Sequence, residues 1–379
     1  MTVTPRVGLL LCVLLSLSCQ RTDIVAGPAD AGRDGSVTGG PPVPDAGPED
    51  AGREDTGPMD AGRTDTGPVE PNDAGAPPDL PRVCPAETCA STLSTSAAFC
   101  DAARPAAVVL GDSCDATSRP LFAYAACSCT DLVTNSEFVV DALDGSALSA
   151  SIAVNQQLRF GSSATIDGSI FVSGRYSSAM SAAVSGDIVQ AVSPRCVCDE
   201  ANLLNTQALI QARATDNDNA PAQLTASSLN GFTSQTLALD CGRYYFDRVV
   251  GDGSLQIEAR GRIALFIAGE LGVAGALTLT LASGASAEIF VGSNVRVDGP
   301  LELSTTRDGN RVLLAVNGTG TIDLAGALVD GSIYAPRAEI VTRGPFELNG
   351  SLFVKRANFG DRATLRYQGI PASRADCSR

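Results

Sequence analysis

Histidine and tryptophan are absent from this sequence of 379 residues, and Lys355 is its only lysine. Without histidine the chain cannot form a Ser-His-Asp or Cys-His catalytic group, and most catalytic zinc sites are excluded as well. Acidic residues outnumber basic ones, 42 to 27, which gives a net charge of −15. Because nucleic-acid binding requires a basic surface that releases phosphate counterions, we expect no nucleic-acid partner.

Long apolar runs are also lacking, apart from one near the N-terminus. The run from Val7 to Leu17 has about 11 residues at ~1.5 Å each, too short for a hydrocarbon core of ~30 Å, so residues 1–18 are typical of a signal peptide. Its end, Ser16-Leu17-Ser18-Cys19, resembles a bacterial lipobox, although Ser16 stands where an aliphatic residue is usual. We therefore expect acylation of Cys19. The alternative is a signal peptide cleaved elsewhere, with Cys19 as a thiol.

The residue after the cysteine bears on the location of the protein. It is Gln20 and not Asp, which by resemblance to characterised lipoproteins argues against retention in the inner membrane. The sequence therefore predicts an outer-membrane lipoprotein of the cell envelope, held to the membrane by its N-terminal lipid. Either side of that membrane, including the cell surface, stays open.

Residues 19–83 have the composition of a linker. Asp-Ala-Gly triplets begin at Asp30, Asp45, Asp60 and Asp73, and prolines and glycines separate them. So few apolar residues cannot offset the chain entropy lost on folding, and we expect an acidic, disordered stalk. A flexible coil of this length spans roughly 45 Å, enough to hold a folded domain clear of lipid headgroups.

Ten cysteines follow Cys19, and an even number in an exported protein favours disulfides because its compartment is oxidising. They are Cys84, Cys89, Cys100, Cys114, Cys127, Cys129, Cys196, Cys198, Cys241 and Cys377. The first six define a cysteine-rich segment at residues 84–135. The connectivity stays open, although the adjacent pairs 127/129 and 196/198 could bridge each other. The same four thiols could instead bind zinc, but structural zinc sites use a gap of two to four residues within each pair, and here the gap is one.

From residue 136 to 370 short β-rich runs alternate with Gly, Asp and Asn. A corner motif of an apolar residue, Asp or Asn, Gly, a small residue and a strand begins at Ile166, Val297, Val329 and Leu348. Gly, Asn and Asp tolerate the positive φ that we expect at such corners. Loosely periodic short strands rich in aliphatic residues predict an all-β fold, a β-solenoid. A β-sandwich or a meander barrel is the alternative, but neither explains the recurring motif.

One segment of this region has helical spacing. Asp199 can cap a helix over about 199–214, in which Leu203, Gln207 and Ile210 share one face. A helix that interrupts a solenoid usually packs along it or covers an open end. Residues 371–379 form a short tail after the solenoid.

Four motifs form a recognisable set: CVCD at 196–199, DNDN at 216–219, GRYYF at 242–246 and IYAP at 333–336. The set resembles a β-helical domain of exported bacterial proteins, present in myxobacterial stalked lipoproteins and in pilus-associated or choice-of-anchor surface proteins. The resemblance covers roughly residues 135–370. It implies a β-helical fold and a surface location, and it carries no established activity.

Acidic side chains supply the candidates for chemistry. Solenoid polysaccharide lyases and hydrolases use clustered acids with Arg or Lys, so Asp298, Asp330, Glu339 and Arg337 form one candidate set. Asp298 and Asp330, however, belong to the corner motif, where a role in the turn is sufficient. No catalytic residue is therefore assigned.

Asp216 and Asp218 are weak candidates for a calcium site, because they alternate with asparagines after the expected helix. The segment lacks the glycine and the final glutamate of an EF-hand loop, and an Asx-rich turn explains it equally well. We expect no cofactor.

These features favour a structural or adhesive envelope protein over an enzyme, with an extracellular polymer or a surface protein as its partner. The alternative is a polysaccharide-active enzyme on the same scaffold, and turnover of uronate and neutral polysaccharides separates the two. Self-association through solenoid ends or edges is a third class.

Overall fold

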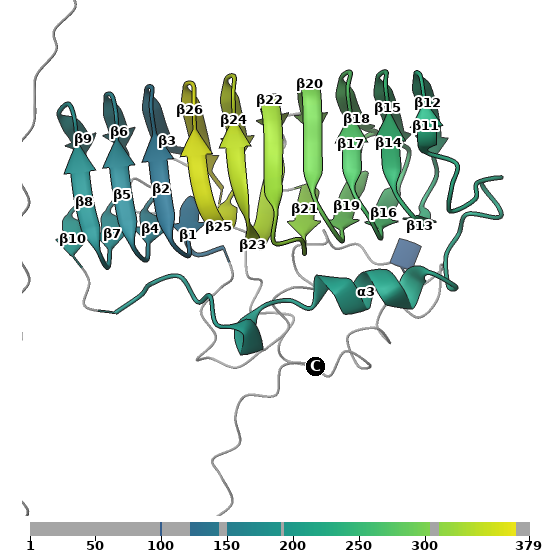
Figure 1. Ribbon diagram of the computed structural model, residues 1–379, viewed down its shortest axis with the longest axis horizontal. Helices are drawn as coiled ribbons and strands as arrows, with labels where there is room; N and C mark the ends of the chain where they lie inside the picture. Colours follow the sequence, from purple (N-terminus) through teal and green to yellow (C-terminus); the bar gives the residue numbers. More distant parts are fainter. Residues whose placement is uncertain (1–98, 101–121, 144–149, 191–192, 304–310, 369–379) are drawn as a thin grey trace, which may run out of the picture. The chain divides into compact units, whose positions relative to one another are not determined.

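The described part of the chain is a β-solenoid, as the sequence predicts (Figure 1). This computed structural model describes residues 99–100, 122–143, 150–190, 193–303 and 311–368. The expected signal peptide, Cys19, the expected stalk and the expected tail lie outside these residues. All strand pairings within them are parallel, and each joins strands of neighbouring turns.

Each turn of the solenoid contributes one strand to each of three parallel sheets, and four long strands bend from one sheet into the next. Sheet I contains, in order along the axis, β11 (Asn230–Phe232), β14 (Val249–Gly251), β17 (Leu271–Val273), β20 (Val295–Leu303), β22 (Thr321–Val329), β23 (Gly331–Thr342), β25 (Leu352–Phe359), β2 (Asp131–Thr134), β5 (Gln157–Phe160) and β8 (Arg175–Ser178).

Sheet II contains β12 (Gln235–Leu239), β15 (Leu255–Ala259), β18 (Leu277–Leu281), the second parts of β20 and β22, β24 (Phe346–Asn349), β26 (Ala363–Tyr367), β3 (Phe138–Ala142), β6 (Ala164–Ile166) and β9 (Ala182–Val184). Sheet III contains β13 (Gly242–Phe246), β16 (Arg262–Ile267), β19 (Ser286–Val291), β21 (Val312–Val316), the first parts of β23 and β25, β1 (Ala126–Ser128), β4 (Ile152–Val154), β7 (Ile170–Val172) and β10 (Ile188–Gln190).

The order of the turns along the axis differs from their order in the sequence (Figure 1). The strands β1 to β10 advance toward one end, and the chain then passes back alongside the solenoid before β11 begins again at the opposite end. We call residues 193–219 of this return the crossing segment. The later turns advance toward the first ones until β25 and β26 pair with β1, β2 and β3. We call this junction of the last and first turns the seam.

Stacked aromatic rings hold the seam together from inside. Phe138 of the first turn lies 5.7 Å from Phe160 and 5.9 Å from Phe359 of the last turn, and Phe359 lies 5.1 Å from Phe346, measured between ring centroids. All four side chains are fully buried. Because such ring pairs contribute about 0.5 to 1.5 kcal/mol each beyond area burial, the stack favours docking of the C-terminal turn on the N-terminal one.

The central strands of sheet III are buried on both faces. Every residue of β16 and β21 is buried, and the outward-facing rings of Phe266 and Phe290 stack with centroids 5.0 Å apart. Leu203 and Ile210 of the crossing segment belong to this outer apolar cluster. A sheet covered on both faces reads as continuous apolar runs, whereas β15 and β18 of sheet II alternate.

The helix is shorter than the sequence suggested. A 3-10 turn, η2, spans Glu200–Asn202, and the helix α3 spans Thr206–Arg213 with Asn205 as its N-cap, whose side chain accepts a hydrogen bond from the Ala208 N–H. Asp199 makes no side-chain cap bond. The Leu204 N–H, which a continuous helix would direct to residue 200, donates instead to Tyr334 Oη at 2.9 Å.

No helix in the described part of the chain is long and apolar enough to cross a membrane. The helix α3 packs on β13, β16 and β19 of sheet III. Tyr334, which accepts the hydrogen bond from Leu204 of the crossing segment, is itself buried. This burial raises the pKa of Tyr334 to about 12.

The corner motif lies where expected, but three of its four glycines do not have the expected positive φ. Gly168 and Gly331 do not have positive φ. A Cβ at Gly168 would lie 2.7 Å from the Ala150 backbone, and one at Gly331 would lie 2.0 Å from the Val312 carbonyl oxygen. Glycine is therefore required because successive turns approach each other closely at the corner.

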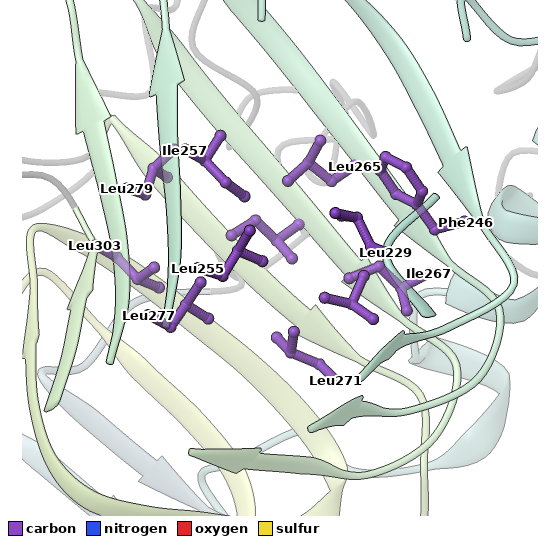
Figure 2. A pocket seen from close by; sticks show the side chains of 12 residues that line it. Leu229, Phe246, Leu255, Ile257, Leu265, Ile267, Leu271, Leu277, Leu279 and Leu303 are labelled. Atoms are coloured by element: carbon purple, nitrogen blue, oxygen red, sulfur yellow. The ribbon is translucent and has the colours of Figure 1, made fainter. Parts of the chain in front are cut away.

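The interior of the solenoid is nearly filled. One void in the interior has a volume of about 20 Å³ and is lined only by apolar side chains, among them Leu255, Leu265 and Leu277 (Figure 2). An apolar void of this size has no polar partner for water and no room for a larger molecule. This void is therefore not a ligand site.

Candidate functional site

A polar hollow of about 340 Å³ lies on the outside of sheet I at the seam. Of the described residues, those lining it are Thr130, Asp131, Gln156, Thr319, Gly320, Thr321, Glu339, Lys355 and Arg356. They include hydroxyl, amide, carboxylate and cationic groups, and none of them is aromatic or aliphatic. We call this site the seam hollow.

Strand register explains why residues so distant in sequence meet there. Thr321 pairs with Glu339, and Glu339 pairs with Arg356. The pairing of β2 with β25 places Asp131 beside Arg356, and Asp131 pairs in turn with Gln157. With neighbouring strands ~4.8 Å apart, this row of five side chains extends roughly 19 Å along the axis.

The charges of the hollow are balanced. Arg356 Nε lies 3.5 Å from Asp131 Oδ2 and 3.8 Å from Glu339 Oε1, so one guanidinium lies between two carboxylates. Lys355 adds a second cation. Ion pairs this long and this exposed contribute little to stability, so these groups stay available to a ligand.

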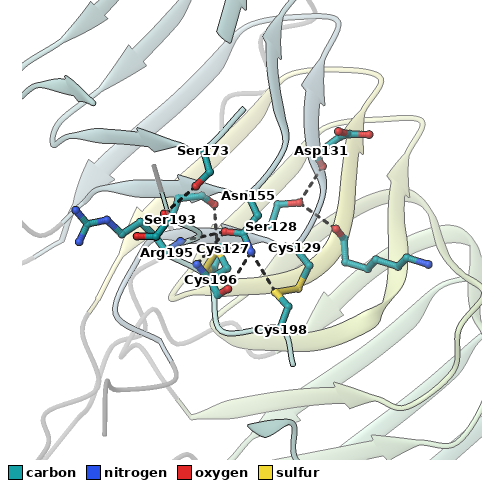
Figure 3. Close-up of a disulfide and its surroundings, with 12 residues drawn as sticks. Cys127, Ser128, Cys129, Asp131, Asn155, Ser173, Ser193, Arg195, Cys196 and Cys198 are labelled. Carbon is teal, nitrogen blue, oxygen red and sulfur yellow. Dashed lines mark hydrogen bonds between the residues drawn. A yellow bond between two sulfur atoms is a disulfide. The ribbon is translucent and has the colours of Figure 1, made fainter. Parts of the chain in front are cut away.

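The floor of the hollow is fixed by hydrogen bonds within one turn and between neighbouring turns. Thr130 Oγ1 donates to the Lys355 carbonyl at 2.9 Å, and the Gln156 N–H donates to the Thr130 carbonyl at 2.9 Å. Ser128 Oγ donates to the Asp131 carbonyl at 2.9 Å, as Figure 3 shows. These bonds join three neighbouring turns, so the site is preformed.

Two disulfides fasten the crossing segment beside the hollow (Figure 3). Cys127 bonds to Cys196 and Cys129 bonds to Cys198, which are the bridges between adjacent pairs that the sequence suggested. Their sulfurs are therefore not thiolates that could bind zinc. The strands β1 and β2 belong to the solenoid, so it includes residues 126–134 of the segment expected to be cysteine-rich.

The same junction is reinforced by one asparagine. Asn155 Oδ1 accepts hydrogen bonds from the backbone N–H groups of Arg195 at 3.1 Å and Cys196 at 3.0 Å, and its Nδ2 donates to the Cys196 carbonyl at 2.9 Å. The Asn155 side chain thus makes the hydrogen bonds to the crossing segment that the backbone of a neighbouring strand would otherwise make. A third disulfide joins Cys100 to Cys241. Cys84, Cys89, Cys114 and Cys377 lie outside the described residues.

The structure does not gather the four candidate catalytic residues around one point. Asp298 pairs with Arg296 and Arg343, at 3.0 and 2.9 Å, and these arginines lower the pKa of its carboxyl group. Arg337 pairs with Glu200 and donates to Asn317. Glu339 faces Arg356 in the hollow.

Asp330, the fourth candidate, is buried at a corner of the solenoid. Its carboxylate accepts a hydrogen bond from Asn349, the equivalent position of the next corner motif. Asn349 in turn accepts from Arg366 of the following turn at 3.2 Å. These contacts give Asp330 a structural part in stacking the turns.

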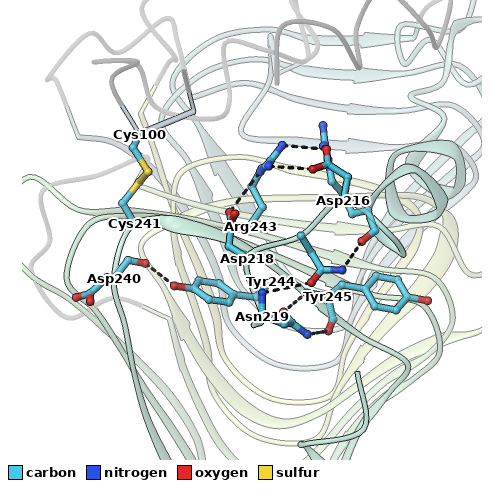
Figure 4. A network of polar contacts seen from close by, with 11 residues as sticks. Cys100, Asp216, Asp218, Asn219, Asp240, Cys241, Arg243, Tyr244 and Tyr245 are labelled. Carbon is cyan, nitrogen blue, oxygen red and sulfur yellow. Dashed lines mark hydrogen bonds and ion pairs between the residues drawn. A yellow bond between two sulfur atoms is a disulfide. The ribbon is translucent and has the colours of Figure 1, made fainter. Parts of the chain in front are cut away.

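The two calcium candidates contact arginines (Figure 4). Asp216 pairs with Arg213 and Arg243, and Asp218 Oδ2 accepts from the Arg243 backbone N–H at 2.7 Å. In the described residues no group of three or more Cys, Asp or Glu is placed to hold a metal ion. The segment instead covers the free edge of β13, because Asn219 exchanges hydrogen bonds with the backbone of Tyr245.

One buried charge pair has no signal in the sequence. Arg262 Nη2 lies 2.8 Å from Glu288 Oε1, and both side chains are almost completely buried. The guanidinium also lies over the Phe99 ring, 4.3 Å from its centroid. Burial raises the pKa of the Glu288 carboxyl group despite the opposing effect of Arg262. The pair joins two turns of sheet III to the segment that carries Cys100.

The fold places the chain among β-solenoid proteins. Residues 198–370 match the family described as "Domain of unknown function (DUF7305)". The match covers most of the crossing segment and the turns from β11 to β26, and leaves out β1 to β10. No curated protein sequence matches the chain.

A solved structure of similar fold is the crystal structure of an ice-binding protein from an Antarctic ascomycete, Antarctomyces psychrotrophicus. The similarity covers 66% of this chain and 97% of that chain, with 16% sequence identity and a TM-score of 0.28. Values this low carry no functional information. Neither match is a stalked lipoprotein or a pilus-associated or anchored surface protein, so that part of the resemblance stays a prediction.

Proposed function

We propose that the chain is a lipid-anchored protein of the bacterial cell envelope that binds a neutral, hydroxyl-rich polymer at the seam hollow. The composition of the hollow carries this proposal. Pockets for apolar small molecules are lined mainly by hydrophobic and aromatic side chains. Here hydroxyl, amide and charged groups line the site, and such a mixture of donors and acceptors matches a surface of hydroxyl groups.

The charge balance favours a neutral polymer over a charged one. Asp131 and Glu339 supply two negative charges to the hollow, and Lys355 and Arg356 supply two positive ones. The net charge of −15 repels polyanions such as polyuronates at long range. The row of side chains on sheet I runs along the axis, so several units of an extended chain can contact it in succession.

Filling the hollow is expected to abolish polymer binding. Thr321 is exposed at the start of β22 and lines the hollow, so Thr321→Arg places a bulky cation where the polymer would lie. We expect at least a tenfold weaker affinity, about 1.4 kcal/mol. Electrophoresis of the full-length chain through native gels that contain neutral or uronate polysaccharides measures this as lost retardation in the neutral gels.

Thr236→Arg is the matched control, since Thr236 is an equally exposed strand threonine on sheet II. This variant should keep the affinity of the unmodified chain. Equal retardation of both variants, or retardation only by uronates, would rule out the seam hollow as a site for neutral polymers.

A polysaccharide-active enzyme is the second candidate, and one observation favours it: Asp131 and Glu339 line the hollow on either side of Arg356. The binding proposal expects polymer length to stay constant on prolonged incubation. New chain ends that disappear with both Asp131→Asn and Glu339→Gln would instead identify an enzyme.

The anchor rests on the sequence around Cys19. Replacement of Cys19 by alanine removes the acylated thiol, and because a lipid chain is the proposed link to the membrane, the protein should move to the soluble fraction and lose labelling by a lipid analogue. Fractionation of cell envelopes measures both effects, with Cys12→Ala as the control that should change neither. Membrane association that survives Cys19→Ala would refute the anchor.

A further inference from the structure

The two ends of the solenoid differ in how their edges are covered. At the end formed by β11, β12 and β13, residues 218 and 219 bond to the outer edge of β13 (Figure 4). The buried Leu229 and the partly buried Leu224, which precede β11 in the chain, close the apolar interior there. At that end the chain itself covers the edge of β13 and the apolar interior.

The opposite end has no such cap in the described residues. β8, β9 and β10 pair only with β5, β6 and β7, so one edge of each strand has no strand partner there. Natural proteins protect edges of this kind with charges, prolines or bulges. Residues 175–190 contain only two charges, Arg175 and Asp187, and no proline.

Apolar side chains accompany these edges. Tyr176, Ala182 and Val184 pack against the core from one side only and stay partly exposed. Met180 is 58% exposed and Ile188 45%, two of the four large hydrophobic side chains of the described residues that are exposed. Hydrogen-bonding edges and apolar surface therefore coincide at one end of the solenoid.

We propose that this end binds the same end of a second copy of the chain and forms a closed dimer. A partner must offer strand edges on three sides at once, and the end of another solenoid does so. The other end cannot offer all three strand edges, because residues 218 and 219 already cover the edge of β13. Pairing like ends closes the assembly, whereas pairing unlike ends would produce a filament.

The charge distribution permits this contact. Two copies with a net charge of −15 repel each other. Residues 175–190 have no net charge, since Arg175 balances Asp187. The uncapped end is thus a place where two acidic chains can approach without adding like charges to the interface. The proposal is independent of any ligand at the seam hollow.

Sedimentation velocity of the full-length chain in a mild non-ionic detergent, over a range of concentrations, tests the proposal. We expect a reversible monomer–dimer equilibrium. Ala182→Lys places a charge at the centre of the contact and should weaken the dimer at least tenfold. Ala183→Lys adds the same charge one residue away, on the exposed flank of sheet II, and should leave the dimer unchanged.

A second variant guards against a folding defect in Ala182→Lys. Met180 is largely exposed, so Met180→Asp leaves the fold intact and should also weaken the dimer. A chain that stays monomeric at the highest attainable concentration would overturn the proposal. So would equal dimer affinities for Ala182→Lys and Ala183→Lys, or assemblies that grow beyond the dimer.

Discussion

Removal of both the Cys127–Cys196 and the Cys129–Cys198 disulfides should lower the free energy of unfolding by about 6 kcal/mol. Removal of either one alone should lower it by only about 2 kcal/mol. Both bridges have the same sequence separation, 69 residues. The first to form closes this long loop and contributes about 4 kcal/mol through the lost entropy of the unfolded chain, whereas the second closes only a few further residues and contributes about 2 kcal/mol.

Denaturant unfolding of three variants measures the effect. One replaces Cys127 and Cys196 by alanine, one replaces Cys129 and Cys198, and one replaces all four, so that no unpaired thiol of a broken bridge remains. A further variant, for comparison, removes the Cys100–Cys241 bridge, which spans 141 residues and encloses both of the other bridges. Losses from the first two variants that add up to the loss in the third would show that the bridges act independently, contrary to this expectation.

Arg262→Met is expected to destabilise the protein by about 3 to 5 kcal/mol, because it leaves the Glu288 carboxylate buried without its partner. Arg296→Met is the matched control. Arg296 forms an ion pair with Asp298 but is 67% exposed, so its loss should cost less than about 1 kcal/mol. Thermal and denaturant unfolding distinguish these outcomes, and equal losses in the two variants would contradict the importance of the buried pair.

The same pair predicts a pH dependence with a defined sign. Burial raises the pKa of Glu288 in the folded state above its value in the unfolded chain. Its contribution to stability is therefore fully present below the unfolded pKa and is lost as pH rises through the folded pKa. Relative to Glu288→Gln, the unmodified chain should lose stability from acidic toward neutral pH. A difference that is constant, or that grows with pH, would contradict this assignment.

The fold class could be predicted because its signals are local. Each corner brings a glycine where neighbouring turns touch, and each strand carries its own burial pattern. The continuous apolar run of Ile263–Ile267 marks the doubly covered sheet III, and the alternating Leu277–Leu281 marks a sheet with one exposed face. The sequence also predicted the helix of the crossing segment, although this helix begins at Thr206 and not near residue 199, because the Leu204 N–H donates to Tyr334.

The seam hollow could not be predicted, because its parts are brought together by the order of the turns. Thr130 and Lys355 are 225 residues apart in sequence and share a hydrogen bond. No local pattern in the sequence indicates that the last turn docks on the first. The stacked phenylalanines that favour this docking cannot be distinguished in the sequence from other core residues. For the same reason the spacing of Asp216 and Asp218 gave no sign of their contacts with Arg243, which lies well beyond the motif.

Hydrogen–deuterium exchange of the full-length chain, with and without a neutral polysaccharide that retards it, tests most directly whether these distant segments form one binding site. The account predicts that the polymer slows exchange together in residues 129–133, 155–158, 319–322, 338–341 and 354–357, which are separate in sequence and adjacent at the seam. Residues 236–238 of β12 in sheet II, which lie away from the seam, should show no change in exchange. Slowed exchange confined to one of these segments, or located on the sheet II control, would contradict the account.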